Sequence, residues 1–380
     1  MKFPQFSPAE VTVKENLLDF LKSEIALAGG AISFARYMEI ALYADQLGFY
    51  TRDSAKWGAC GDYITAPHLS SLFAECIANP FSTVLQDIPE GDILELGAGS
   101  GIFAIEVMKA LHEKNMLPRY YYIYEKSPLL RERQKQSIEK ECGALIDRFQ
   151  WLETLEGFTM EGIIFGNEIL DAIPCHIFRI EEGSAKEKLV TIENHQLQWV
   201  LSDPISAGFL DKMDALLAEY SFSDGYESEI HLHIIPLMKS IEKTLKKGVV
   251  IFFDYGYGRK EYYHPDRMMG TLMCFLQHHR HSDPLLYPGL QDITAHVDFT
   301  TVIESTDFDL LGFTTQAGFL LGSELTDIIA KKNISIRENA AIKRLILPQE
   351  MGEIIKVIGL GKGFDRDLSG FSFQDLRGSL

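Results

Sequence analysis

Cysteine is scarce in this sequence of 380 residues, which contains five cysteines and no CxxC pair. Structural zinc sites and disulfide frameworks depend on closely spaced cysteines, so we expect neither, and we expect no other metal site. Hydrophobic runs are short, and one of the longest, at residues 248–253, is far below the roughly 20 residues of a membrane-spanning helix. The first eight residues show neither a signal-peptide core nor an arginine-rich transit pattern. These absences predict a cytoplasmic protein of a reducing compartment without membrane association.

Positive charge is in the minority, because 36 lysine and arginine residues stand against 54 aspartate and glutamate residues. The formal net charge of −18 repels the phosphate backbone of nucleic acids. It attracts a basic partner, or it serves solubility alone. We therefore expect no nucleic-acid partner. The remaining composition is that of a globular protein, which excludes a disordered chain, a collagen and a coiled-coil rod.

The hydrophobic periodicity changes near residue 89. Residues 10–85 are mostly helical in pattern, whereas the following part alternates hydrophobic strands with helices. The expected strands are 92–96, 120–125, 148–152, 162–166 and 249–253, and the expected helices between them are 101–114, 128–142 and 234–247, the last ending at Gly248. This alternation predicts a parallel sheet with right-handed crossovers.

Two later segments interrupt the alternation. Residues 176–202 have the two-residue period of antiparallel strands and predict an inserted β-meander, and residues 255–295 predict a long irregular segment. We therefore expect an α/β fold in three parts. They are a helical N-terminal cap (1–88), a core (89–175 and 230–380) and an insert (176–229).

The strongest functional signal is a glycine-rich turn. The sequence ILELGAGSGI at 93–102 leads from a hydrophobic strand through Gly97, Gly99 and Gly101 into a helix. Glycine allows a sharp turn and leaves bare backbone for a ligand at the helix N-terminus. The dinucleotide motif GxGxxG would need a glycine where Ile102 stands, and the P-loop pattern is also absent. The spacing favours a ligand whose amino-acid end lies at the turn.

The next strand ends at Glu125. A carboxylate at that edge of a parallel sheet can accept hydrogen bonds from both hydroxyls of a ribose. With the glycine turn and a third strand ending at Trp151 and Leu152, it predicts a pocket for S-adenosylmethionine. The alternative is a tight turn in another nucleotide-fold protein. An NAD-linked oxidoreductase is disfavoured by Ile102.

Polar residues follow two later strands. Asn167, Glu168 and Asp171 come after the fourth strand, next to the expected donor site. Asn167 and Asp171 could instead cap a helix, whereas Glu168 is harder to assign to a structural role. Asp254 follows the fifth strand and either lines the substrate side or belongs to a turn. The histidine-rich segment 278–281 lacks the other ligands of a metal site, so we expect it to line the active site.

Several segments, taken in order, resemble one family. They are FARYMEIALY (34–43), GDYIT (61–65), ELGAGSG (95–101), EKSP (125–128), NEILDAIP (167–174), DYG (254–256), GTL (270–272) and DITAHVDF (292–299). The combination is similar to that of the MidA-like methyltransferases. That family includes a mitochondrial assembly factor of respiratory complex I that methylates an arginine of a complex I subunit.

The resemblance implies a class I methyltransferase with a Rossmann-like α/β sheet and S-adenosylmethionine as the donor. It also implies protein arginine methylation, hence a basic or arginine-bearing protein as substrate. We expect the cofactor-binding residues to be Glu95, Gly97, Gly99, Gly101, Glu125, Trp151, Leu152, Asn167, Tyr63 and Thr65. We expect the catalytic residues to be Glu168, Asp171, Asp254 and His278.

A guanidinium acceptor explains why carboxylates are expected at the reaction centre. Arginine stays protonated, with its nitrogen lone pairs delocalised. A carboxylate can hold the group in bidentate fashion and orient one nitrogen, a role that suits Glu168 helped by Asp171 or Asp254. A loop around Tyr63 and Thr65 would close over the cofactor and exclude water. A cofactor-binding assembly factor without turnover and a small-molecule methyltransferase stay open as alternatives.

Overall fold

The computed structural model of the chain describes residues 6–52, 65–277 and 279–380. Its main sheet has the strand order β15–β16–β10–β5–β2–β3–β4, with β14 beside β10. The strands are β2 (Asp92–Leu96), β3 (Tyr121–Tyr124), β4 (Phe149–Leu152), β5 (Met160–Asn167), β10 (Leu245–Tyr257), β14 (Val297–Asp298), β15 (Asp309–Thr315) and β16 (Ile355–Lys362). Neighbours pair in parallel, except that β16 is antiparallel to both β10 and β15. The expected α/β fold with a Rossmann-like sheet is confirmed.

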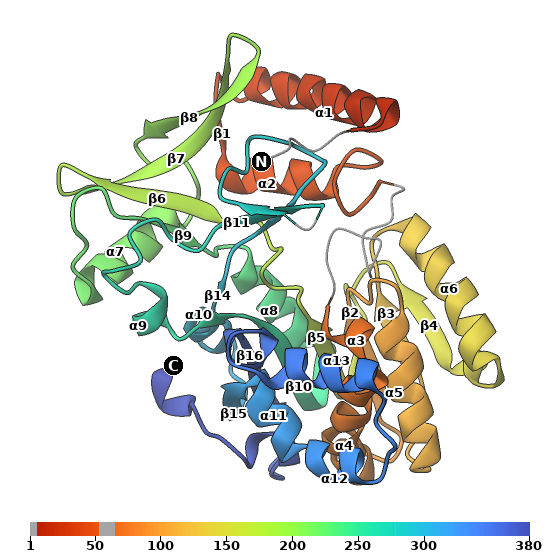
Figure 1. Cartoon of the computed structure of the whole chain (residues 1–380). Helices are drawn as coiled ribbons and strands as arrows, with labels where there is room; N and C mark the ends of the chain where they lie inside the picture. The colour runs from red at the N-terminus through yellow and green to blue at the C-terminus, as the bar shows by residue number, and fades with distance from the viewer. Residues whose placement is uncertain (1–5, 53–64, 278) are drawn as a thin grey trace.

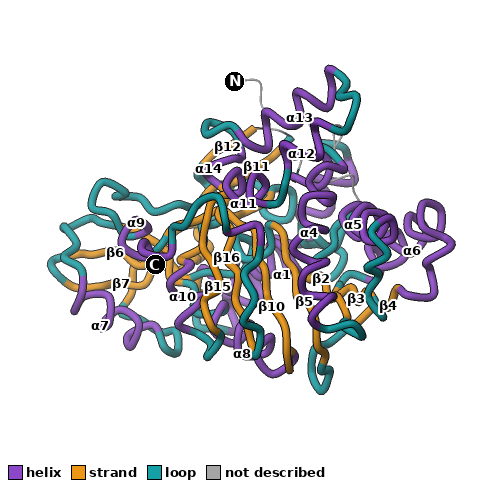
Figure 2. The backbone as a smooth tube through the Cα atoms, turned by 90° about the horizontal axis from the view of Figure 1, so that it is seen from below, coloured by secondary structure: helices purple, strands orange, loops and turns teal. Residues whose placement is uncertain are grey.

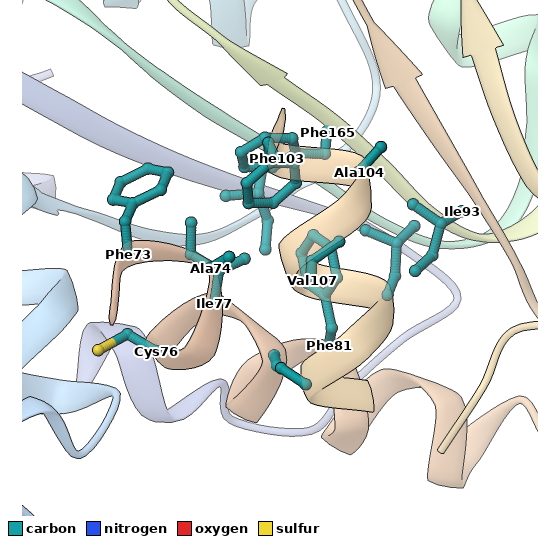
Figure 3. Close-up of a cluster of buried hydrophobic side chains, with 14 of the residues drawn as sticks. Phe73, Ala74, Cys76, Ile77, Phe81, Ile93, Phe103, Ala104, Val107 and Phe165 are labelled. Atoms are coloured by element: carbon teal, nitrogen blue, oxygen red, sulfur yellow. The ribbon is translucent and has the colours of Figure 1, made fainter. Parts of the chain in front are cut away.

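Helices cover both faces of this sheet, because successive side chains of a buried strand point to opposite sides. One face carries α4 (Ser71–Asp87), α5 (Ile102–Glu113), α6 (Pro128–Cys142), α11 (Gln316–Gly322), α12 (Leu325–Ala330) and α13 (Ile336–Ile346). The other face carries α8 (Ile234–Thr244) and α10 (Phe299–Glu304). In the first layer Phe103 stacks on Phe165 with ring centroids 4.2 Å apart, and Phe81 of α4 meets both rings edge-on (Figure 3). α4 therefore shares its core with the main sheet.

A second sheet has the order β1–β7–β6–β9, with β8 beside β7. Its elements are β1 (Ile32–Ser33), β6 (His176–Glu181), β7 (Ser184–Glu193), β8 (Gln196–Ser202) and β9 (Glu227–Ile230), with α7 (Phe209–Glu219) packed against it. The expected antiparallel meander is therefore present. The second sheet and α6 lie at opposite ends of the molecule (Figures 1 and 2).

The N-terminal helices pack on this second sheet. α1 (Pro8–Leu27) and α2 (Phe34–Tyr43) share one hydrophobic cluster with residues of β6 and β7, and β1 pairs with β7. We call α1, α2 and the second sheet the second lobe. The division into cap, core and insert remains a proposal. None of the helices in the described part of the chain is both long and hydrophobic enough to cross a membrane.

Two expectations are corrected by the structure. α8 ends at Thr244, and Gly248 lies inside β10 opposite Gly162. A Cβ at position 248 would collide with the carbonyl oxygen of Gly162, so close strand contact rather than a helix end requires the glycine. The segment expected to be irregular contains α9 (Arg259–Tyr262) and a small sheet. The strands of that sheet are β11 (Met273–Leu276), β12 (His279–His281) and β13 (Asp292–Thr294).

Candidate active site

A cavity of about 930 Å³ lies at the carboxyl ends of β2, β3, β5 and β10. The strand order of the main sheet reverses between β2 and β5, and ligands of open α/β sheets bind at such a point. Residues of α2, β11 and β13 form the opposite wall. The volume is near the upper end of the range for ligand cavities, about 300–1,000 Å³, so it can hold a nucleoside-sized ligand together with a second group.

The glycine turn forms one end of this cavity. Gly97 and Gly99 line it with φ angles of +66° and +54°, in the left-handed region that favours glycine. A Cβ at Gly97 would lie 3.0 Å from Cγ2 of Ile169. Gly101, predicted to bind the cofactor, is not part of the cavity wall. It is the N-cap of α5, with φ +80°, and faces Gln134.

Gln134 of α6 holds the turn in place and was missed by the sequence analysis. Its side chain is fully buried, and Nε2 donates to the carbonyl oxygen of Gly99 at 2.9 Å. Oε1 accepts from Nε1 of Trp151 at 3.0 Å. The available signal was its position on the buried face of α6, four residues from both Leu130 and Ile138.

The acid at the end of β3 lies where the sequence predicted it. Glu125 lines the cavity, and its Oε1 accepts the N–H of Ser127 at 2.9 Å. Trp151 and Leu152 do not line the cavity, and their predicted contact with the cofactor stays a prediction. Trp151 supports the site through Gln134, and the carbonyl oxygen of Leu152 accepts the N–H of Glu125 at 3.4 Å.

Glu95 lies on β2 and also lines the cavity, where its carboxylate accepts from the hydroxyl of Tyr121 at 2.7 Å. Burial raises the pKa of Glu95 to about 8, although the hydrogen bond from Tyr121 opposes this shift. This acid is therefore largely protonated at neutral pH and can donate a hydrogen bond into the cavity.

Glu168 follows β5 with a φ angle of +52°, which is uncommon for a residue with a side chain. Its N–H donates to the carbonyl oxygen of Phe253 at 2.8 Å, and its Oε1 accepts from Nδ2 of Asn167 at 2.9 Å. Burial raises the pKa of Glu168 to about 8. Asn167 also lines the cavity, and its buried Oδ1 has no hydrogen-bond partner within the described residues. Strained backbone and an unsatisfied polar atom at a cavity wall are typical of functional sites.

The acid beneath this turn has a different role from the one expected. Asp254 is fully buried and does not line the cavity. Its Oδ2 accepts the backbone N–H groups of Ile169 at 2.9 Å, Leu170 at 2.6 Å and Asp171 at 3.4 Å. The prediction that Asp254 is catalytic is therefore corrected, since it positions the turn. Asp171 does line the cavity, and burial, with Asp254 and Asp292 nearby, raises the pKa of Asp171 well above its usual range.

We expect Asp254→Ala to lower the free energy of unfolding by about 3 kcal/mol, because it leaves three backbone N–H groups, two of them buried, without their acceptor. Denaturant titration measures this change. Asp309→Ala removes an exposed carboxylate at the start of β15 and should change the free energy by less than about 0.5 kcal/mol. A loss below about 1 kcal/mol for Asp254→Ala would show that the turn does not depend on this carboxylate.

The cavity wall opposite the strand ends is polar and aromatic. Tyr43 of α2 donates to the carbonyl oxygen of Ala172 at 2.9 Å, and Tyr50 donates to Oδ1 of Asp292 at 2.8 Å. The rings of Tyr43 and Tyr50 are stacked with centroids 5.5 Å apart. Tyr43 and Asp292 belong to segments that carry the family resemblance, and this was the available signal for them.

Three predictions concern segments at the edge of the described structure. Thr65 lines the cavity directly before α3 (Ala66–Leu69). Tyr63 and His278 lie outside the described residues, so their roles stay predictions. In the described ranges, no three or more His, Cys, Asp or Glu side chains are grouped so that they could hold a metal ion.

A family model with the description "Putative S-adenosyl-L-methionine-dependent methyltransferase" matches residues 75–314. The chain belongs to this family. It is an S-adenosylmethionine-dependent methyltransferase, and both the resemblance and the cofactor expected from the sequence are confirmed.

Relatives of this methyltransferase match most of the chain. A crystal structure of a Burkholderia thailandensis protein bound to S-adenosyl-homocysteine is 36% identical, with a TM-score of 0.94, and covers 99% of this chain and 100% of that chain. The mitochondrial protein arginine methyltransferase NDUFAF7 of Danio rerio is 27% identical over 90% of this chain and 86% of its own length. Its Drosophila melanogaster homolog is 26% identical over 79% and 72%.

These relatives contradict one expectation. The sequence predicted a cytoplasmic location, whereas the curated relatives from zebrafish, fly and mouse are all named as mitochondrial proteins. The pattern of the first eight residues, on which the prediction depended, is therefore not sufficient evidence for a cellular location.

The residues of the cavity fit the methyl donor. Bare backbone at Gly97 and Gly99, the carboxylate of Glu125 and the unsatisfied Oδ1 of Asn167 all face one cavity. These residues would hold S-adenosylmethionine, which supplies an electrophilic methyl group when bound. Glu168 and Asp171 line the same cavity at the end of β5.

Proposed function

We propose that this methyltransferase modifies a guanidinium nitrogen of an arginine side chain in a protein substrate. The observation that carries the proposal is Glu168, a half-buried residue whose carboxyl group lies at the wall of the donor cavity and which follows β5 in a strained turn. The names of the curated relatives support the same acceptor. The net charge of −18 favours the approach of a basic protein.

An arginine acceptor requires orientation more than covalent help. Its guanidinium is always protonated, and its charge is spread over three nitrogens. Glu168 can accept two N–H groups in bidentate fashion, which fixes the plane of the group and leaves one nitrogen directed at the methyl group. Correct placement of two reactants can lower the activation free energy by up to about 7–11 kcal/mol.

Two neighbours assist this placement. The Nδ2 of Asn167 donates to Oε1 of Glu168 and fixes the orientation of the carboxylate. Asp171 adds a second carboxyl group to the wall, whose oxygen can accept a hydrogen bond from the guanidinium. Glu168 can also take the proton that the nitrogen loses as the new bond forms, because its pKa of about 8 makes it a stronger base than an exposed glutamate.

Radiolabelling tests the proposal. The purified protein is incubated with tritiated-methyl S-adenosylmethionine and a lysate of cells from which its gene has been deleted. We expect label in a protein band, and methylarginine after acid hydrolysis of that band. Label confined to small molecules, or to another side chain, would contradict an arginine acceptor, and no label at all would contradict turnover.

The pH dependence of the reaction gives a second test, with the labelled protein as acceptor. Only ionised Glu168 can accept both N–H groups, and its raised pKa of about 8 leaves it mostly protonated at pH 6. We therefore expect kcat/KM to rise from pH 6 and to level off above about pH 8, with a difference of about 100-fold.

Glu95, whose pKa is also about 8, is the internal control for this profile. In Glu168→Gln the residual activity should lose the rise if Glu168 causes it, and should keep the rise if Glu95 does. A flat profile of the unmodified protein between pH 6 and pH 9 would contradict the role of Glu168.

A further inference from the structure

His68 lies in the cavity wall between the glycine turn and the acceptor side. Its Nδ1 is 2.8 Å from Oγ1 of Thr65, and its Nε2 is 2.8 Å from Oγ of Ser100. Ser100 belongs to the glycine turn, and Thr65 is the N-cap of α3. One imidazole ring therefore joins α3 to the turn that would hold the donor.

The start of α3 also contacts the acceptor side. The N–H of Ala66 donates to Oε1 of Glu168 at 3.4 Å, and this same oxygen accepts from Asn167. Ala66 directly follows Thr65, so a shift of this part of the backbone moves both contacts together. Hydrogen bonds, together with the peptide bond between Thr65 and Ala66, thus connect Ser100 through His68 and the start of α3 to Glu168.

The protonation state of the ring limits how the two hydroxyls can bond to it. Burial lowers the pKa of His68, so the ring is neutral at physiological pH. A neutral imidazole has one N–H donor and one acceptor nitrogen. One of the two hydroxyls must therefore donate to the ring while the other accepts from it, and both bonds depend on the same ring orientation.

We propose that His68 is a positioning residue that couples binding of the methyl donor at the glycine turn to the placement of Glu168. Coupling between two sites is reciprocal, so a change at Glu168 also alters the affinity for the donor. The inference rests on the role proposed for Glu168, but its test needs no acceptor. The inference can therefore be tested even if the acceptor is not an arginine.

Two substitutions test the bonds of the two ring nitrogens separately. In His68→Gln the amide lies near the position of Nε2 and can keep the bond to Ser100. In His68→Asn the amide lies near the position of Nδ1 and can keep only the bond to Thr65. Titration calorimetry with S-adenosyl-homocysteine gives the Kd of each variant, and thermal denaturation shows that each is folded.

We expect His68→Asn to weaken S-adenosyl-homocysteine binding about 3- to 10-fold, which corresponds to the loss of one hydrogen bond. Ser100→Ala should have the same effect, and the double variant should bind no more weakly than either. His68→Gln should stay within about twofold of the unmodified protein. His112→Gln, an exposed substitution near the end of α5, is the control and should leave the Kd unchanged.

The link to Glu168 is tested by a double-mutant cycle. We expect the effect of Glu168→Gln on the Kd to differ by about threefold or more between the unmodified protein and His68→Asn. Equal binding by His68→Asn and His68→Gln would overturn the bond to the glycine turn. Effects of His68→Asn and Glu168→Gln that simply multiply would overturn the coupling, because a merely structural histidine produces that result.

Discussion

Glu168→Gln is expected to lower the rate of methyl transfer about 10²- to 10³-fold, the usual effect of removing a charged group that stabilises a transition state. The amide keeps the size of the side chain but can no longer accept two N–H groups from a guanidinium. Steady-state kinetics with the labelled acceptor measures the rate, and calorimetry measures the Kd for S-adenosyl-homocysteine. That Kd should change by less than about tenfold, because Glu125 and the glycine turn are intact.

Two further variants serve as controls for Glu168→Gln. Glu113→Gln removes an exposed carboxylate at the end of α5 and should leave the rate unchanged. Glu168→Asp keeps the charge but shortens the side chain, so it should retain more activity than Glu168→Gln. Unchanged turnover in Glu168→Gln would remove this residue from the mechanism.

Gly97→Ala is expected to weaken S-adenosyl-homocysteine binding about 100-fold, which corresponds to roughly 3 kcal/mol. The new Cβ enters the cavity wall 3.0 Å from Ile169, at the place where the donor would lie against bare backbone. It also imposes a left-handed conformation on alanine, which costs roughly 1–2 kcal/mol of folding stability.

Gly157→Ala separates these two effects. Gly157 has a φ angle of +74°, close to the +66° of Gly97, but it lies in the exposed turn between β4 and β5 with no atom within 4 Å of its Cβ position. We expect similar destabilisation in both variants and normal binding in Gly157→Ala. Normal binding by Gly97→Ala would show that the donor does not lie against this turn.

Local sequence predicted the parts of the site that depend on local geometry. The glycine turn, Glu125 and Glu168 each follow a hydrophobic strand directly, and the parallel sheet brings such strand ends to one edge. Glu168 and Glu125 line the same cavity for this reason.

The supporting residues could not be predicted in this way, because their function depends on contacts distant in sequence. Gln134 reaches Gly99 and His68 reaches Ser100 only after α6 and α3 have packed against the turn. Asp254 was expected to follow its strand, whereas it lies inside β10, which continues to Tyr257. The sequence also did not show that its oxygen would be occupied by the turn after β5. Gly248 was predicted to end a helix, because its contact with Gly162 cannot be inferred from the local sequence.

The shared core of the second lobe has a consequence for biosynthesis. α2 leaves the ribosome well before β6 and β7, against which it packs and which follow more than a hundred residues later. Its hydrophobic cluster, with Phe34 and Tyr37, includes α1 but lacks β7 until residue 193 has been translated. We therefore expect nascent chains that stop before β7 to depend on chaperones, and the lobe to form only after β2, β3, β4 and β5 of the main sheet have been synthesised.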